Sequence, residues 1–227
     1  MAMKIETDAI AELRGLMTLM TGDEKHTDAA TSTLDVLYVL YEHVLRIDPA
    51  NPEWEGRDRF LLSKGHGPMA YYAVLARKGF FPIEELARFL EWDGILGGHP
   101  DRSKVPGVEV STGSLGHGLP MAVGVAYGLR AKGRDDQRVF VLTGDAELNE
   151  GSNWEAILHA GARGLGNLTL VVIDNRSSTV AMDDIAEKLT AFGWDAATVD
   201  GRDHDELHAA LSQRAEAPTA VVAVIDE

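Results

Sequence analysis

Two polar side chains follow two buried, apolar stretches of the sequence. Residues 138–143 (RVFVLT) lead into Gly144 and Asp145, and residues 168–173 (LTLVVI) lead to Asn175. The carboxyl ends of parallel strands open on one crevice, so the oxygens of Asp145 and Asn175 are expected to meet there. Mg²⁺ and Ca²⁺ prefer such oxygen ligands. The strand ends alone also allow a purely structural interpretation, in which Asp145 caps the next helix and Asn175 makes a turn.

Histidine is the second residue type that could do chemistry. Several histidines stand in loops or at helix starts, flanked by small residues: His26, His66, His99 and His117. A single loop histidine is usually only a polar surface group, but several together suggest a pocket that binds hydroxyls and moves protons.

A glycine-rich stretch, residues 109–126, precedes another helix. Its Gly113, Gly116 and Gly118 do not follow the GxGxxG order, and they follow a loop and not a strand, so the stretch is a weak dinucleotide fingerprint. Its glycines would still let a ligand approach the backbone closely.

The elements that must position these residues follow from hydrophobic periodicity. Strands are predicted at residues 59–63, 138–143, 168–173, 196–199 and 219–225. Helices are predicted at residues 4–20, 33–45, 67–79, 82–92, 119–133, 153–163, 183–192 and 204–215. This alternation predicts an α/β fold with a doubly wound, mostly parallel sheet and helices on both faces. We expect residues 1–227 to form a single domain.

Composition excludes several classes of function. The 227 residues carry a formal net charge of −15, which argues against binding a nucleic-acid backbone. The chain has no cysteine, so it offers neither disulfides nor zinc–thiolate sites. The N-terminal residues do not resemble a signal peptide, and no apolar run approaches the length of a membrane span. We therefore expect a cytoplasmic protein that does not enter membranes.

Five stretches together resemble the N-terminal, diphosphate-binding part of transketolases, most closely that of split enzymes in which this part is a separate subunit. They are DRFLLSKGHGPMAYYAVLARKGFF, GGHPDRSKVPGVEVSTGSLGHGLPMAVGVAYGLR, GDAELNEGSNWEA, NLTLVVIDN and AFGWDAATVDGRDHDEL. The resemblance covers nearly the whole chain in the family's order. It implies thiamine diphosphate and a divalent metal, Mg²⁺ or Ca²⁺, as cofactors. It also implies transfer of a two-carbon ketol unit from a ketose donor to an aldehyde acceptor, with a sugar or sugar phosphate as substrate.

The resemblance also assigns roles to individual residues. Asp145 would bind the metal through its carboxylate, Asn175 through its side chain and Ser177 through its backbone carbonyl. The backbone of Gly144 and Ala146 would lie close to the diphosphate.

The remaining roles concern the organic part of the cofactor and the substrate. His66 would contact the diphosphate and the substrate, and His26 and His99 would face the donor ketose. Gly113 and Leu115 would line the aminopyrimidine and thiazolium rings. His117, where many relatives have Gln, would have a supporting role.

Three departures from the family pattern bear on these roles. Ala146 replaces the glycine of a Gly-Asp-Gly motif, which is strained if its φ is positive and harmless if its φ is negative. The segment after Asn175 is several residues shorter than usual. The sequence ends before a further glycine-rich segment and histidine, and it lacks the second domain with its cofactor-activating glutamate.

The resemblance therefore implies a partner, a C-terminal, pyrimidine-binding transketolase subunit, in an α₂β₂ heterotetramer. The partner face is expected to be apolar, with Leu115, Leu119, Pro120 and Met121 as candidates. Two alternatives to the transketolase function are a non-catalytic assembly subunit and a thiamine-diphosphate carboligase that uses another donor.

Overall fold

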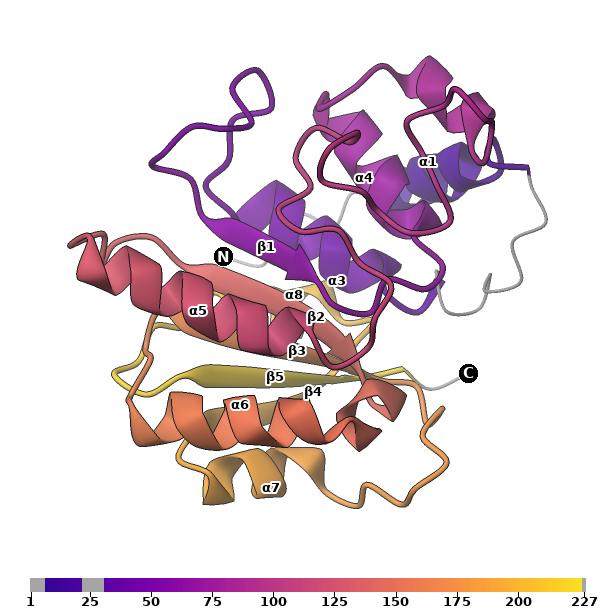
Figure 1. Cartoon of the computed structure of the whole chain (residues 1–227). Coiled ribbons are helices and arrows are strands. Elements are labelled where there is room, and N and C mark those ends of the chain that lie inside the picture. Colours follow the sequence, from indigo (N-terminus) through magenta and orange to yellow (C-terminus); the bar gives the residue numbers. More distant parts are fainter. Residues whose placement is uncertain (1–6, 22–30, 226–227) are drawn as a thin grey trace.

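The computed structural model describes residues 7–21 and 31–225, and the centre of this part is a five-stranded sheet (Figure 1). Its strands are β1 (Arg59–Leu62), β2 (Val139–Gly144), β3 (Leu168–Asp174), β4 (Asp195–Asp200) and β5 (Thr219–Val224), in the order β1-β2-β3-β5-β4. Every neighbouring pair is parallel. The predicted α/β fold is confirmed, and so is the adjacency of the strands at 138–143 and 168–173.

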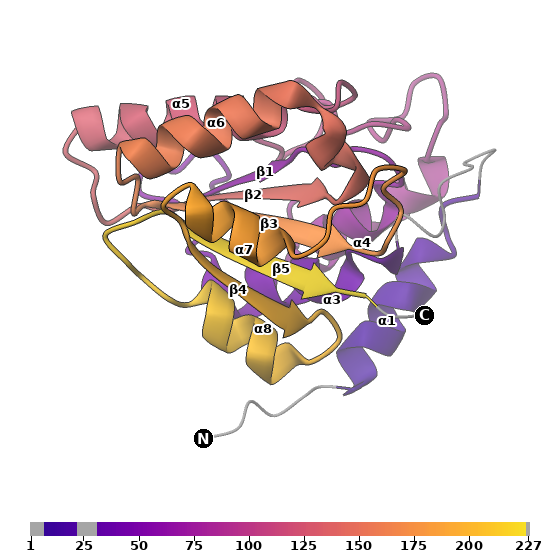
Figure 2. The ribbon, with the colours of Figure 1, turned by 90° about the horizontal axis from the view of Figure 1, so that it is seen from below.

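Helices cover both faces of the sheet (Figure 2). On one face lie α5 (Gly118–Ala131), α6 (Gly151–Ala162) and α7 (Ile185–Ala191), and on the other lie α1 (Thr7–Met17), α3 (Leu34–Val39), α4 (Met69–Lys78) and α8 (His204–Leu211). A π-helical turn, η1 (Leu40–Val44), continues α3. Among the helices in the described ranges, none combines the length and the apolar character that crossing a membrane requires.

Alternate residues of the strands build two separate cores. Phe140 and Leu142 of β2 pack with the α1, α3, α4 and α8 layer, whereas Val139 and Val141 pack with the α5, α6 and α7 layer. Successive strand residues point to opposite faces, and both faces here are covered. This arrangement explains why β2 and β3 are continuously apolar and do not alternate apolar and polar residues.

One helix predicted from the sequence has another form in the structure. Residues 82–92 form only the short 3₁₀ helix η2 (Ile83–Arg88), and not a longer α-helix. Leu86 within η2 and Phe89 directly after it are buried apolar residues, and their spacing of three suits a 3₁₀ turn. Leu90 then adopts a left-handed backbone with φ of 65°, where a right-handed helix cannot continue.

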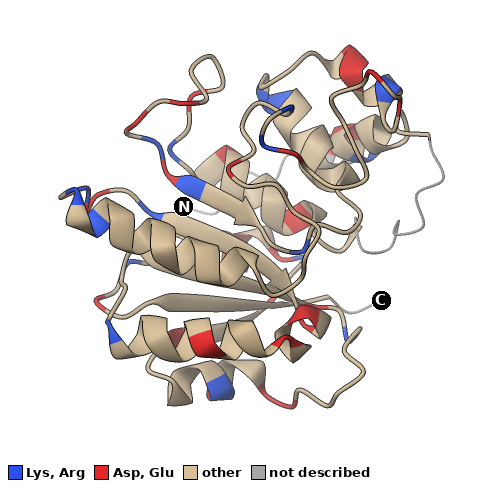
Figure 3. Ribbon diagram, in the orientation of Figure 1, with Lys and Arg blue, Asp and Glu red and all other residues tan. Residues whose placement is uncertain are grey.

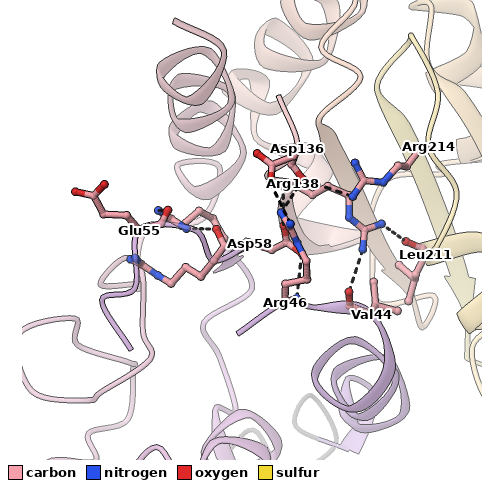
Figure 4. A network of polar contacts seen from close by, with 10 residues as sticks. Val44, Arg46, Glu55, Asp58, Asp136, Arg138, Leu211 and Arg214 are labelled. Carbon is pink, nitrogen blue, oxygen red and sulfur yellow. Dashed lines mark hydrogen bonds and ion pairs between the residues drawn. The ribbon is translucent and has the colours of Figure 1, made fainter. Parts of the chain in front are cut away.

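A polar network closes the amino-terminal end of β1 and β2 (Figure 4). The buried carboxylate of Asp58 accepts hydrogen bonds from the backbone N–H groups of Arg46 (3.0 Å) and Arg138 (2.9 Å). The Arg138 guanidinium donates to the carbonyl oxygens of Leu211 (3.1 Å) and Val44 (3.0 Å). The network joins the starts of two strands to the end of α8 and to η1, at the edge opposite Asp145.

Two adjacent residues of α6 test this packing. Ile157 is fully buried against the sheet, whereas Leu158 is 55% exposed. We expect Ile157→Ala to lower the free energy of unfolding by about 2–5 kcal/mol, because it leaves a cavity in the core. Leu158→Ala should change it by less than about 0.5 kcal/mol. Urea denaturation of the purified chain measures both, and equal losses would contradict the orientation of α6.

Candidate active site

The carboxyl ends of β2 and β3 place Asp145 at the edge of the sheet. Gly144 pairs with Ile173, and the Asp145 N–H donates to the Ile173 carbonyl oxygen at 2.9 Å. The Asp145 side chain is almost fully buried. Its two carboxylate oxygens accept hydrogen bonds from the Ser177 hydroxyl (2.6 Å) and the Ser178 N–H (3.0 Å). The segment after β3 therefore folds directly over Asp145.

Asn175 carries a buried polar atom that lacks a hydrogen-bond partner at this edge. Its side-chain oxygen Oδ1 is buried and accepts no hydrogen bond. A buried acceptor without a partner is costly unless something absent from the protein chain satisfies it. A hard cation bound by Asp145, Asn175 and an oxygen of Ser177 would do so, and these residue types fit Mg²⁺ or Ca²⁺. Residues 7–21 and 31–225 contain no cluster of three or more His, Cys, Asp or Glu side chains, so a metal here would rely on amide, carbonyl and ligand oxygens.

The backbone at Ala146 is unstrained. Ala146 begins the 3₁₀ helix η3 (Ala146–Asn149), and it is not among the described non-glycine residues with positive φ, which are Leu90, Arg176 and Asp183. The methyl group in place of a glycine hydrogen therefore costs no backbone strain. At the preceding Gly144, a Cβ atom would lie 3.1 Å from Cδ of Lys64, so close packing favours glycine there.

Close packing also explains the glycines of the loop before α5. Gly116 has φ of 81°, and a Cβ there would lie 2.6 Å from atoms of both Glu150 and Ser152. A Cβ on Gly118 would lie 2.3 Å from Cβ of Ser63. The loop thus passes between the end of β1 and the start of α6 with no room for side chains at these positions.

The predicted histidines separate into three groups. The rings of His66 and His99 lie 5.2 Å apart in an edge-to-face contact, and the Cβ position of Gly113 is 3.8 Å from the His99 ring. His117 precedes α5 and lines a cavity of about 280 Å³ together with Thr112 and Met121. His26 lies outside the described residues. The half-buried Leu115 lies in the loop between Gly113 and His117.

Two charged residues of the site were missed from the sequence. Lys64 follows β1 and is buried, with its ammonium group donating to the Ser32 hydroxyl at 3.2 Å. Burial lowers the pKa of Lys64 to about 8, although the nearby carboxylates of Asp145 and Glu147 act in the opposite direction. Glu147 lies in η3, and burial raises the pKa of its carboxyl group. The sequence could have indicated both, because each charged residue lies within a few positions of the end of a buried strand.

A pair of glycine variants tests the packing of the loop. We expect Gly118→Ala to destabilise the chain by about 1–3 kcal/mol, because the added methyl collides with Ser63. Gly124→Ala, within α5, meets nothing within 4 Å and should be neutral or stabilise by up to about 1 kcal/mol. Chemical denaturation of the two variants measures the difference, and a neutral Gly118→Ala would contradict the close approach.

Comparison with known proteins gives consistent matches. Residues 5–225 match the family described as "Transketolase, thiamine diphosphate binding domain". The chain is 50% identical over 216 residues to "Ferredoxin fas2" of Rhodococcoides fascians, covering 94% of this chain and 71% of that protein. It is 42% identical over 188 residues to an apulose-4-phosphate transketolase subunit of Actinobacillus succinogenes, covering 78% of this chain and 67% of that protein.

A solved transketolase shares the fold. The structure of transketolase from Campylobacter jejuni superposes with a TM-score of 0.81 at 26% identity, covering 97% of this chain and 38% of the other. The chain thus spans about two fifths of that enzyme but about two thirds of the Actinobacillus transketolase subunit. The chain therefore belongs to the transketolase family, as the N-terminal, thiamine diphosphate-binding part that split transketolases carry as a separate subunit.

Proposed function

We propose that this protein transfers a two-carbon ketol unit from a ketose, a sugar or sugar phosphate, to an aldehyde acceptor, together with a pyrimidine-binding subunit in an α₂β₂ heterotetramer. The observation that carries the proposal is the buried, unpartnered oxygen of Asn175, which stands at the same carboxyl edge of the sheet as the buried Asp145 carboxylate. Two oxygens in this position suit a metal that bridges to a diphosphate.

The proposed metal is Mg²⁺, with Ca²⁺ as the alternative. Asp145 and Asn175 hold it through side-chain oxygens, and Ser177 is the third candidate ligand. The Ser177 hydroxyl donates to Asp145, which supports its place beside the metal. The backbone of Gly144 and Ala146 would hold the diphosphate. When bound, thiamine diphosphate supplies the electron sink for breaking and forming carbon–carbon bonds.

The histidine pair faces the substrate side in this proposal. His66 and His99 come from separate loops and meet edge to face, so their ring nitrogens can bind sugar hydroxyls and transfer protons at one place. His26 is proposed to join them, and its position lies outside the described residues. Gly113, Leu115 and His117 are proposed to contact the rings of the cofactor.

The outer face of α5 is the proposed partner surface. Arg130 is the only charged residue of this helix, and the ribbon of α5 in Figure 3 is correspondingly tan along most of its length. Met121 is 40% exposed there. Leu119, by contrast, is fully buried in the core between α5 and the sheet, so its prediction as a partner contact is wrong. An uncharged, partly apolar helix face suits an obligate interface.

The two alternatives from the sequence are not favoured. The chain matches the thiamine diphosphate-binding domain over nearly its full length, and its relatives include proteins named as transketolase subunits. The name of the Rhodococcoides relative describes a ferredoxin, whose cluster would need cysteine ligands. This chain has no cysteine, so we transfer no such role to it. The single-domain boundary at 1–227 and a cytoplasmic location stay predictions.

Reconstitution tests the proposed reaction. The purified chain alone should show no ketol transfer, because one half of the site cannot clamp both rings of the cofactor. Adding the pyrimidine-binding subunit should produce activity together with a complex of α₂β₂ mass. Coupled assays and light scattering measure the two outcomes. Full activity of this chain without a partner would contradict the split-site proposal.

The metal site has its own test. In the assembled complex, Asp145→Ala should abolish Mg²⁺-dependent binding of thiamine diphosphate in titration calorimetry, because the carboxylate that neutralises the metal is lost. Asp174→Ala removes a neighbouring carboxylate that accepts only from the Arg176 N–H in the described contacts, and it should weaken binding far less. Undiminished affinity in Asp145→Ala would remove Asp145 from the metal site.

A further inference from the structure

We propose that Glu147 is a positioning residue for the cofactor, which holds the glycine-rich loop (residues 113–118) against the end of the sheet. The proposal rests on the function proposed above, since the loop matters because it would contact thiamine diphosphate. The contacts that define it, however, lie within this chain.

One oxygen of Glu147 joins two segments that are distant in sequence. Oε1 accepts a hydrogen bond from the Ser63 hydroxyl at 2.5 Å and another from the Gly116 N–H at 2.9 Å. The Ser63 hydroxyl oxygen in turn accepts from the Gly118 N–H at 3.1 Å. Glu147 and Ser63 together therefore bind two backbone N–H groups of the loop, and Glu147 itself is only 2% exposed.

Gly116 also accepts a hydrogen bond from a residue of α6. The Ser152 hydroxyl donates to the Gly116 carbonyl oxygen at 2.7 Å, so Gly116 is bound through both its N–H and its C=O. Asn153 donates to the backbone carbonyl oxygen of Glu147 at 2.7 Å and steadies the turn that carries the carboxylate. Glycine has no side chain with which to anchor itself, so these contacts determine where Gly116 lies.

The position of Gly116 sets that of its neighbours. Leu115 and His117 flank it directly, and both are residues that we propose to contact the cofactor. Glu147 lies two residues after Asp145, in the same 3₁₀ turn. The loop is therefore positioned relative to the strand end that carries the proposed metal ligand, and not relative to a remote surface.

The second oxygen of Glu147 argues against a role in stability alone. Oε2 is buried without a well-formed hydrogen bond, and only the nearby Gly144 N–H and the Lys64 charge favour its ionised form. A buried carboxylate of this kind is destabilising compared with a well-packed apolar side chain. Removing the whole carboxylate would in turn leave the Ser63 O–H and Gly116 N–H without their acceptor.

The test compares Glu147→Ala and Glu147→Gln in the complex reconstituted with the pyrimidine-binding subunit. Glu147→Ala should weaken thiamine diphosphate binding by about tenfold or more, the effect of losing one or two buried hydrogen bonds. The affinity of Glu147→Gln for thiamine diphosphate should stay within about threefold of that of the parent, because the amide oxygen can accept the same two hydrogen bonds. Equal losses in the two variants would overturn the proposal.

Asp58→Ala is the matched control for a purely structural effect. Asp58 is also a buried carboxylate that accepts from backbone N–H groups, but it lies at the opposite edge of the sheet. Both alanine variants should lower the melting temperature, and only Glu147→Ala should change cofactor affinity. A cofactor affinity that falls equally in Asp58→Ala and Glu147→Ala would mean that Glu147 acts through stability alone.

Hydrogen exchange measures how firmly the loop is held, and it needs no bound cofactor. The amides of Gly116 and Gly118 should exchange faster in Glu147→Ala than in the parent complex, while peptides from the start of β2 stay unchanged. Ser63→Ala leaves η3 intact and should make the Gly118 amide exchange faster. This variant takes the place of Glu147→Ala if Glu147→Ala does not fold. Unchanged exchange of both amides would overturn the proposal. A parent complex that does not bind thiamine diphosphate would instead refute the proposed function, while the exchange result would still report on the loop.

Discussion

The parallel pairing of β2 with β3 is the constraint on which the rest of the site depends. Six residue pairs, from Val139 with Leu168 to Gly144 with Ile173, hold the two strands in register. Because both strands end at the same level, the chain leaves the sheet twice at one edge. The bond from the Asp145 N–H to the Ile173 carbonyl oxygen is the last contact of this pairing, and it sets the carboxylate beside the segment that carries Asn175. A slip of one residue would turn the core side chains of a strand to the wrong face, so the packing of both helical layers protects this geometry.

Both edges of the sheet bury charged side chains. At the amino edge, Asp58 and Arg138 are bound to backbone groups and join elements of the core. Both edges also bury side-chain atoms without hydrogen-bond partners: Gln137 Oε1, Arg138 Nε and Asn167 Oδ1 at the amino edge, and Asn175 Oδ1 at the carboxyl edge. Unpaired atoms alone therefore do not distinguish the carboxyl edge, and its proposed function rests on the oxygen donors of Asp145 and Asn175 at the strand ends.

The family carries this domain in two ways, as a separate subunit and within a longer chain. Contacts inside the domain give a physical reason why both arrangements are possible. The strand ends, the glycine-rich loop and η3 are joined by hydrogen bonds that lie within residues 63–178. The carboxyl edge that carries Asp145 can thus form inside one polypeptide, and the remaining part of the proposed site can be supplied by another domain or another chain.

The sequence by itself was sufficient for the sheet and for the edge at which Asp145 and Asn175 stand. Apolar runs with the right spacing predicted the strands, and the polar residues just beyond them predicted that Asp145 and Asn175 stand at one edge of the sheet, because both features are local in the chain. The roles assigned to the individual histidines came from the family resemblance and not from any local pattern.

Only the tertiary structure decided the remainder. The negative φ of Ala146, the buried position of Leu119 and the 3₁₀ turn at Ile83–Arg88 depend on how segments pack together. The contact between Glu147 and Ser63 joins residues 84 positions apart. A local pattern contains no information about which distant hydroxyl a buried carboxylate will reach, since that partner is chosen by the folding of the whole chain.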